Sequence, residues 1–539
     1  MTLYSIAAAI FLALAFLVFA RARLLTYLHF FQQEEYDNPR FLRWILSKRA
    51  FDQRASLLLL AVSVPLLVTT EYLHQFVELV PIWLSFAAIG FIVIALREPD
   101  PRQHGKKRLA MTARAKRILW IALAICALMA AALVYIHGQL PLWILAVQAL
   151  PLTLALSNLS LQPLEKTFQQ RYWDEAHTKL AKLRPTVIGI TGSFGKTSVK
   201  HILGHLLDSQ AATLITPGSI NTPMGIARII REQLGPQHRY FVCEMGAYGP
   251  GSIARLCRLA PPDMAVITAV GRAHYERFRS LDTVAAAKFE LAEAASERNG
   301  KLIVAADVLQ YPAARNFHET HKDAVIVIGG TDGAMRISNA RQERTGIVFD
   351  GAWQGRTYTF RAPLFGLHHC GNVALAFATA CMLGCKPEDL IASLVNLPQV
   401  KHRLEVTQAP GSWTVVDDAY NSNPVGFAAA LELLDVLQNQ GGKRILITPG
   451  MVELGAAHDE EHAKIGTLAA RHVDVLLPVI PERINTLVEN FRTHAPNATI
   501  VPCRTFAEAR AWLDANGTAQ DVVLIENDLP DIYEATLRL

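Results

Sequence analysis

The chain has 539 residues, enough for several domains, and 51% of them are hydrophobic while only 18% are charged. That composition is too apolar for an ordinary soluble enzyme. The formal net charge of +5 is too small to indicate a nucleic-acid partner, and no basic stripe with interleaved aromatic residues is present. The seven cysteines form no Cys-x-x-Cys pair, which favours reduced, mostly buried thiols in a protein that faces the cytosol.

The first 160 residues are predicted to form a membrane region of five helices. Each helix corresponds to an apolar stretch near the ~20 residues that cross a bilayer. The stretches lie at about 2–20, 56–70, 80–96, 118–136 and 139–157. Met1–Ala20 has no basic segment before its apolar run, so we expect an uncleaved anchor rather than a signal peptide.

The charges of the loops predict the orientation of these helices. Residues 21–54 carry seven Lys or Arg and residues 97–117 carry eight, whereas residues 71–79 and 137–140 carry none. Basic loops stay in the cytoplasm. We therefore predict a multi-pass protein with its N-terminus outside and everything after Asn158 inside, where ATP is available.

A phosphate-binding loop is predicted after the membrane region. Residues 161–184 form an expected amphipathic connector, and a strand over Thr186–Ile190 then leads into a glycine-rich turn and a helix. In this context backbone N–H groups and the helix N-terminus bind phosphates. Lys196 would reach the β- and γ-phosphates of ATP, and the Thr197 hydroxyl would bind Mg²⁺. For this motif alone, an ordinary glycine-rich turn is the alternative.

Strands and helices alternate along the rest of the chain. The apolar strand Tyr240–Glu244 ends in an acid, an arrangement that places a carboxylate on Mg²⁺. The fold class predicted for the soluble part is α/β. It comprises a P-loop central domain with a mostly parallel sheet over residues 185–398, and a Rossmann-like C-terminal domain over residues 399–539.

Seven motifs occur in an order that resembles the Mur ligases. They are Thr191-Gly-Ser-Phe-Gly-Lys-Thr-Ser198, Glu244-Met-Gly-Ala247, Val270-Gly-Arg-Ala-His274, Ala287-Lys-Phe-Glu290, Arg403-Leu-Glu405, Asp417-Asp-Ala-Tyr-Asn-Ser-Asn-Pro424 and Met451-Val-Glu-Leu-Gly455. The resemblance covers about residues 185–525. It is strongest to the branch of the family that adds D-alanyl-D-alanine to a UDP-muramoyl tripeptide.

The resemblance implies a set of site residues. The implied catalytic residues are Lys196, His274, Lys288, Arg403 and Asp418. The implied ATP-binding residues are Gly192, Ser193, Gly195, Lys196, Thr197, Ser198, Asn372 (at the adenine), Arg403 and Asp418. Two Mg²⁺ ions are implied, with the ligands Thr197, Glu244, His274 and Lys288, the lysine as a carbamate. Substrate contacts are implied for Asn221, Thr222, Tyr420, Asn421 and Asn423.

The implied reaction joins a carboxylate to an amino acid or peptide amine, with ATP as the energy source and an acyl phosphate as the intermediate. The chain departs from the family at its N-terminus, where the predicted spans replace the domain that binds UDP. We therefore predict a ligase of cell-envelope synthesis at the bacterial inner membrane, with a lipid-linked or membrane-bound carboxylate substrate. His369 replaces an Asn that the family has beside the adenine site. Ile525-Glu-Asn-Asp-Leu-Pro530 stands in place of a Lys-Gly-Ser turn, so D-alanyl-D-alanine is not assured as the amine.

Four other functions compete with this prediction. The spans could merely tether a ligase that acts on a soluble UDP-muramoyl peptide, or the chain could be a poly-γ-glutamate-type synthetase. A transporter driven by a P-loop ATPase would need polar residues inside the spans, and these contain almost none. An inactive envelope scaffold would not need Lys196, Thr197, Glu244, His274 and Lys288.

Overall fold

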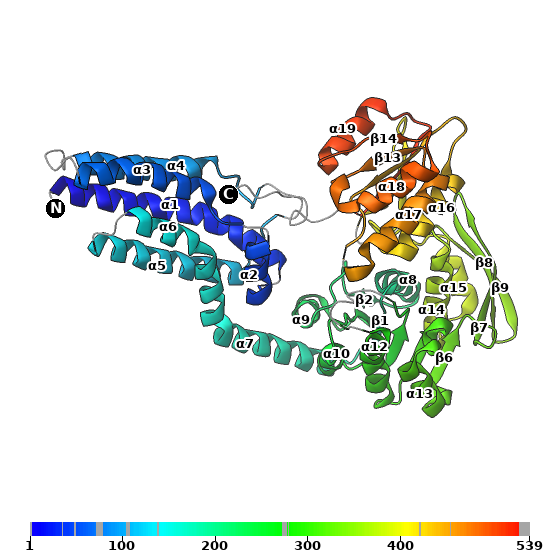
Figure 1. Ribbon diagram of the computed structural model, residues 1–539. Helices are drawn as coiled ribbons and strands as arrows, with labels where there is room; N and C mark the ends of the chain where they lie inside the picture. Colours follow the sequence, from blue (N-terminus) through cyan, green and yellow to red (C-terminus); the bar gives the residue numbers. More distant parts are fainter. Residues whose placement is uncertain are drawn as a thin grey trace. The chain divides into compact units, whose positions relative to one another are not determined.

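The computed structural model describes residues 3–34, 36–47, 50–71, 79–103, 108–136, 140–271, 278, 280–419, 422–452 and 454–527. The chain divides into two compact units, one that reaches Phe168 and another over Gln169–Asp528. Figure 1 shows helices in the first unit, and strands flanked by helices in the second.

The first unit is a bundle of apolar helices. Its helices are α1 (Leu3–Gln33), α2 (Asn38–Ser47), α3 (Gln53–Glu71), α4 (Val80–Arg97), α5 (Ala113–Tyr135) and α6 (Leu140–Gln148), followed by α7 (Leu150–Leu183), which continues into the second unit. α1 packs on α4 and α5, and α3 packs on α4 and α6. Buried leucine, phenylalanine and alanine side chains form the shared core.

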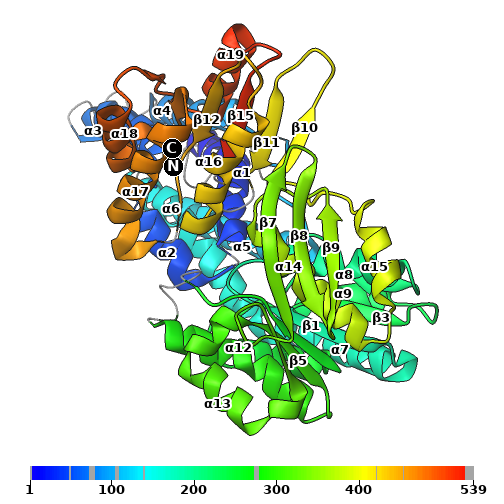
Figure 2. The same cartoon turned by 90° about the vertical axis from the view of Figure 1, so that its right-hand side faces the viewer.

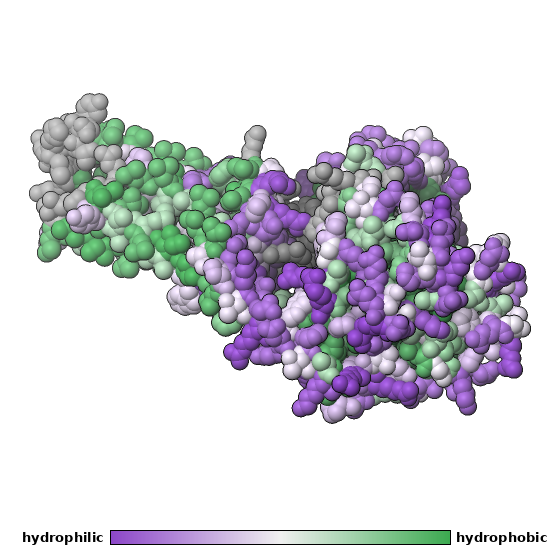
Figure 3. Space-filling model, turned by 90° about the horizontal axis from the view of Figure 1, so that it is seen from below, coloured by the Kyte–Doolittle hydropathy of each residue, from purple (hydrophilic) through white to green (hydrophobic). Residues whose placement is uncertain are grey.

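Three of these helices, α1, α4 and α5, are long and apolar enough to cross a membrane. α6 and α7 pass the same test only as a pair bent by 50°, and the apolar part of α3, Gln53–Val68, is shorter. All five predicted stretches are therefore helical, while the number of spans stays a prediction. Figure 3 shows hydrophobic side chains over the surface of this unit. The exposed apolar residues include Leu3, Leu14, Leu57, Leu96 and Leu128. An apolar surface of this kind is typical of contact with lipid.

α7 contains both the end of the last predicted span and the predicted connector. α7 runs through residue 160, so the predicted boundary of the membrane region lies inside one helix. The break lies earlier, between α6 and α7, inside the stretch 139–157 that was expected to be one span. Pro151 explains the break, because it has no N–H to donate to the carbonyl of Val147. α7 ends at Leu183, and Arg184 takes a φ of 50° before Pro185.

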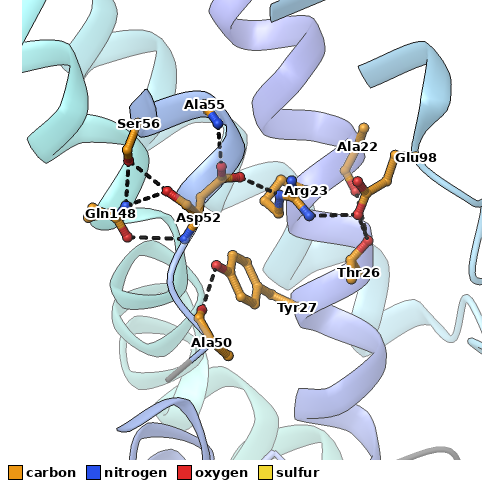
Figure 4. A network of polar contacts seen from close by, with 10 residues as sticks. All are labelled: Ala22, Arg23, Thr26, Tyr27, Ala50, Asp52, Ala55, Ser56, Glu98 and Gln148. Atoms are coloured by element: carbon orange, nitrogen blue, oxygen red, sulfur yellow. Dashed lines mark hydrogen bonds and ion pairs between the residues drawn. The ribbon is translucent and has the colours of Figure 1, made fainter. Parts of the chain in front are cut away.

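A buried ion cluster joins α1 to the start of α3 and the end of α4 (Figure 4). The side chain of Arg23 is 1% exposed, and its Nε lies 2.7 Å from Asp52 Oδ2 while its Nη1 lies 2.9 Å from Glu98 Oε1. Thr26 donates a hydrogen bond of 2.7 Å to Glu98, and Gln148 donates one of 2.7 Å to the carbonyl of Asp52. Buried charges in an apolar bundle are stable only when they are paired. The cluster therefore acts as a clamp between three helices.

The second unit contains a nine-stranded sheet in the order β2-β3-β1-β4-β5-β6-β7-β8-β9. The strands are β1 (Thr186–Thr191), β2 (Thr213–Ile215), β3 (Tyr240–Glu244), β4 (Met264–Ile267), β5 (Lys301–Ala305), β6 (Val325–Ile328), β7 (Met335–Glu343), β8 (Gly346–Trp353) and β9 (Arg356–Ala362). Pairing is parallel from β2 to β7 and antiparallel among β7, β8 and β9. The last three strands form the long ribbon in Figure 2.

Helices cover both faces of this sheet. They are α8 (Lys196–Asp208), α9 (Pro223–Gln233), α10 (Ser252–Leu259), α12 (Leu281–Ser296), α13 (Pro312–Thr320), α14 (His368–Met382) and α15 (Pro387–Leu394). Alternate residues of β1 point to opposite faces. Val187 joins the core of α9, α10 and α12, whereas Ile188 and Ile190 join the core of α8 and α14.

A six-stranded sheet follows, in the order β10-β11-β15-β12-β13-β14. Its strands are β10 (Glu405–Gln408), β11 (Thr414–Asp418), β12 (Arg444–Thr448), β13 (Val475–Pro478), β14 (Thr499–Ile500) and β15 (Val522–Glu526). Its helices are α16 (Pro424–Leu437), α17 (His458–His472), α18 (Asn485–His494) and α19 (Phe506–Asn516). All neighbours are parallel except β10 and β11. The predicted fold class, apolar helices followed by two α/β sheets, is confirmed.

Replacing Arg23 by methionine is expected to lower the free energy of unfolding of the helical unit by about 3–5 kcal/mol, because two buried carboxylates lose their counter-charge. Thermal unfolding of the detergent-solubilised protein measures the change. Arg102 supplies the matched control, since it pairs with Asp100 at 2.6 Å but is 40% exposed. Exposed pairs contribute about 0–1 kcal/mol. Equal unfolding temperatures for Arg23→Met and Arg102→Met would contradict the clamp.

Candidate active site

The glycine-rich turn between β1 and α8 is fixed by the segment that follows β4. The Ser193 N–H donates a hydrogen bond of 2.8 Å to the carbonyl of Ala269, and the Ser193 hydroxyl lies 3.0 Å from the carbonyl oxygen of Gly271. The Thr268 hydroxyl donates to the carbonyl of Phe194. β4 is the parallel neighbour of β1, so the two strands end at the same edge of the sheet and hold the turn there.

Gly195 begins α8 in a conformation that other residues rarely adopt. Its φ is +79°, and a Cβ at this position would lie 2.7 Å from Asn372 Oδ1 on α14. The Asn372 amide lies 3.2 Å from His369 Nδ1, and burial lowers the pKa of His369 well below its usual value. Asn372 thus packs against the phosphate loop, and its predicted adenine contact stays a prediction.

Lys196 curls over the loop from the first turn of α8. Its Nζ donates to the carbonyls of Gly192 at 2.7 Å and Ser193 at 3.3 Å. Burial lowers the pKa of Lys196, although the charge of Glu244 opposes the shift. The first N–H groups of α8, through Ser198, have no acceptor within the helix. Together with the Lys196 ammonium they form a site for an anion.

Glu244 lies beside this turn because β3 is also a parallel neighbour of β1, with Ile190 opposite Glu244. Glu244 is 1% exposed, and Oε2 accepts hydrogen bonds from the Thr197 hydroxyl at 2.9 Å and from Lys200 at 3.0 Å. Its Oε1 accepts one from the Asn221 amide at 3.2 Å. Burial raises the pKa of Glu244, but the nearby lysines and these hydrogen bonds outweigh it and leave the pKa below its usual value.

The donor set around Glu244 fits a magnesium ion. Mg²⁺ prefers oxygen ligands, and it commonly uses one or two protein oxygens together with phosphate oxygens. The Thr197 hydroxyl and the Glu244 carboxylate lie within hydrogen-bond distance of each other. They would hold the ion as the sequence predicts, next to the anion site at the start of α8.

Lys288 lies buried on α12. Burial lowers its pKa well below the usual value, and the charge of Lys196 lowers it further. No acidic partner of Lys288 occurs among the described residues. Burial and the charge of Lys196 both favour the uncharged amine over the ammonium. His274, the other predicted ligand of a second metal, lies outside the described residues, and so do Tyr420 and Asn421.

The segment before β10 brings the C-terminal sheet to the site. Arg403 is close enough for its charge to lower the pKa of Lys196, after the larger effects of burial and of Glu244. The Leu404 N–H donates to Asp418 Oδ1 at 3.2 Å. Burial raises the pKa of Asp418 to about 6, while the charge of Arg403 opposes the shift. Arg403 thus lies within electrostatic reach of both Lys196 and Asp418.

Asp418 has a second acid beside it. β11 and β15 are parallel neighbours, with Asp418 opposite Glu526. The Ser422 hydroxyl donates to Glu526 Oε1. Glu526 is fully buried, and burial followed by the charge of Asp418 raises its pKa well above the usual value.

The predicted substrate residues take different places. Asn221 connects Glu244 to Tyr248, whose hydroxyl donates to Asn221 Oδ1 at 2.9 Å. Thr222 and Asn423 precede α9 and α16, and Asn423 caps its helix by accepting a hydrogen bond of 3.0 Å from Gly426 N–H. Sequence reasoning missed Lys200, although its position four residues after Lys196 on the same helix was a signal.

Two matches define the class of protein. Residues 190–380 match the Mur ligase middle domain, and residues 402–526 match the domain described as Mur ligase, glutamate ligase domain. These ranges contain the phosphate loop, the acid at the end of β3 and the segment with Arg403. The chain belongs to the Mur ligase family.

Individual relatives share the name of one enzyme. The UDP-N-acetylmuramoyl-tripeptide–D-alanyl-D-alanine ligase of Bacillus subtilis is 31% identical over 294 residues, covering 54% of this chain and 62% of that protein. The ligase of the same name from Escherichia coli is 31% identical over 294 residues, covering 54% of this chain and 64% of that protein. The chain thus spans less than two thirds of the length of these relatives.

Solved structures agree with the fold. A crystal structure of MurF from Acinetobacter baumannii has a TM-score of 0.56 and 26% identity, and the match covers 67% of this chain and 77% of that one. MurF ligase from Thermotoga maritima in complex with ADP has a TM-score of 0.56 and 25% identity, covering 67% of this chain and 80% of that one.

Gly195→Ala is expected to weaken nucleotide binding at least about tenfold, because a side chain at positive φ costs about 1–2 kcal/mol and this one would also overlap Asn372. Titration with a fluorescent ATP analogue measures the affinity. Gly371→Ala on α14 is the control, since its Cβ would meet nothing within 4 Å. Wild-type affinity in Gly195→Ala would show that the turn does not bind the nucleotide.

Proposed function

We propose that the protein is an ATP-dependent ligase that joins a carboxylate to an amino acid or peptide amine in cell-envelope synthesis. The observation that carries the proposal is the arrangement of Lys196, Thr197 and Glu244 around the N-terminus of α8. The relatives named as muramoyl-tripeptide ligases and the ADP complex of MurF from Thermotoga maritima support it. Membership of the Mur ligase family supports the peptide-ligase chemistry. The names of the relatives support the classes of carboxylate and amine substrate.

The residues of the site would act mainly by positioning and by charge neutralisation. The α8 amides and Lys196 hold the ATP phosphates, and a substrate carboxylate attacks the γ-phosphorus, which gives ADP and an acyl phosphate. The amine then attacks the acyl carbon, and phosphate leaves with the electron pair of the broken C–O bond. Thr197 and Glu244 would hold Mg²⁺, which would supply positive charge to the phosphates. Arg403, on the segment before β10, and Asp418, at the end of β11, would help to close the site against water.

Lys288 is proposed to carry a carbamate. An uncharged amine adds to CO₂, forming an N–C bond and releasing one proton, and the product is an anion. That anion would balance the nearby Lys196 ammonium and would offer oxygen ligands to a second metal, with His274 as a further ligand. The depressed pKa and the absence of an acidic partner of Lys288 in the described part of the chain support this modification.

Incubation with ¹³C-bicarbonate is expected to produce one labelled carbamate carbon in the wild-type protein, detected by ¹³C NMR. Lys288→Met is the control and should lack this signal. Lys179→Met removes another lysine of the second unit, one that donates to the Arg231 carbonyl at 2.7 Å, and should retain the signal. Identical spectra for wild type and Lys288→Met would exclude the modification.

The proposed function includes a location at the membrane. Residues 1–160 form five spans with the N-terminus outside, residues 161–184 connect them to the enzyme, and the domains 185–398 and 399–539 lie in the cytoplasm. The carboxylate substrate is lipid-linked or otherwise bound to the bacterial inner membrane. The exposed apolar side chains of the first unit and the alternating loop charges support this placement.

Detergent-purified protein with Mg-ATP is expected to release phosphate only when native membrane lipid extract and one amine are both present. A panel of amino acids and dipeptides identifies the amine, and Lys196→Ala is the control that should abolish release. Release driven by soluble UDP-muramoyl peptide would contradict the lipid-linked substrate and make the spans a tether. Release without any acceptor would favour a transporter, and no release under any condition would favour a scaffold.

A further inference from the structure

Lys200 is a charged residue of the site to which neither the motifs nor the reaction assigns a role. It lies one helical turn after Lys196 on α8, and its side chain is 0% exposed. Its Nζ lies 3.0 Å from Glu244 Oε2 and donates a second hydrogen bond to the carbonyl of Gly218. A buried ammonium is retained only when partners compensate for lost hydration, and these two acceptors do so.

The ion pair changes what Glu244 offers to a metal. The Oε2 atom that accepts from the Thr197 hydroxyl is the same atom that faces Lys200. A fixed positive charge beside a metal ligand repels a cation, and the repulsion is strong in a buried site. Glu244 therefore attracts a free divalent ion less than an unpaired carboxylate would. Phosphate groups that bind at the start of α8 are negatively charged and attract the divalent ion themselves. The weak attraction of Glu244 for the ion is therefore compensated once ATP is bound.

Lys200 also connects Glu244, the predicted metal ligand, to the turn that follows β2. Gly218 lies in that turn with a φ of +52°, and Asn221 follows three residues later. Asn221 donates to the other carboxylate oxygen of Glu244. Lys200 and Asn221 thus fix Glu244 from two sides, and both contacts involve the segment that leads into α9.

We propose that Lys200 is a positioning residue that orients Glu244 toward Thr197 and weakens the binding of free metal, so that Mg²⁺ enters the site together with ATP. This inference rests on the proposed function. It adds that the metal binds together with the nucleotide rather than before it. The ion pair between Lys200 and Glu244 is the proposed cause of this order.

The test measures Mn²⁺ binding by electron paramagnetic resonance in the absence and presence of a non-hydrolysable ATP analogue. Lys200→Met is expected to bind Mn²⁺ without nucleotide at least about fivefold more tightly than wild type, and the gain in affinity caused by the analogue should shrink. Lys179→Met, which loses an ammonium that donates to the Arg231 carbonyl, should behave as wild type. A smaller change in nucleotide-free affinity, or weaker binding, would overturn the inference.

Lys200→Gln provides the same test if the methionine variant does not fold, because it keeps a donor for Gly218 and removes only the charge. The Mn²⁺ titration needs no acceptor substrate. If the proposed function is wrong, the wild-type protein shows no acceptor-dependent phosphate release. If this inference is wrong, the variants show unchanged metal affinity, so the two failures are distinguishable.

Discussion

The second unit depends on one electrostatic interaction, which brings together the N-terminus of α8 and the carboxyl ends of β1 and β3. Parallel pairing places Ile190 opposite Glu244, so the acid that ends β3 lies beside the turn that ends β1. The helix N-terminus attracts anions and the acid attracts cations, and the two sites are within one hydrogen bond of each other through Thr197. A metal–polyanion pair such as Mg-ATP matches that arrangement of opposite charges.

The sequence predicted this edge of the sheet well, for a physical reason. Strand–turn–helix order puts the glycine-rich turn at a strand end, and a second apolar strand ending in an acid comes to the same edge whenever the strands are parallel. Thr197 and Glu244 could therefore be paired from their positions in the sequence. The second α/β sheet was also predictable, because apolar strands and helices alternate regularly beyond residue 413.

Other features depend on contacts that periodicity does not report. The position of Lys200 one turn after Lys196 places both lysines on one face of the helix, but its pairing with Glu244 is seen only in the structure. Asn372 lies far along the chain from Gly195, and their contact comes from the packing of α14 on α8. The strand β10 is four residues long and pairs only at the edge of its sheet, so its pattern was too short to detect. The bend between α6 and α7 had a signal in Pro151, which the apolar run concealed.

The two acids at the ends of β11 and β15 have a consequence for how the protein responds to acidity. In the unfolded chain Asp418 would titrate near pH 4, whereas in the folded protein its pKa is about 6, and burial raises the pKa of Glu526 well above its usual value. Folding of this sheet is therefore coupled to proton uptake. The stability gained from protonated Asp418 is complete below about pH 4 and is lost as the pH rises through about 6. Calorimetry in buffers of different ionisation enthalpy would register the protons directly, and an unfolding enthalpy independent of the buffer would show that none are taken up. At neutral pH the contribution of protonated Asp418 to the stability of this sheet is therefore largely lost.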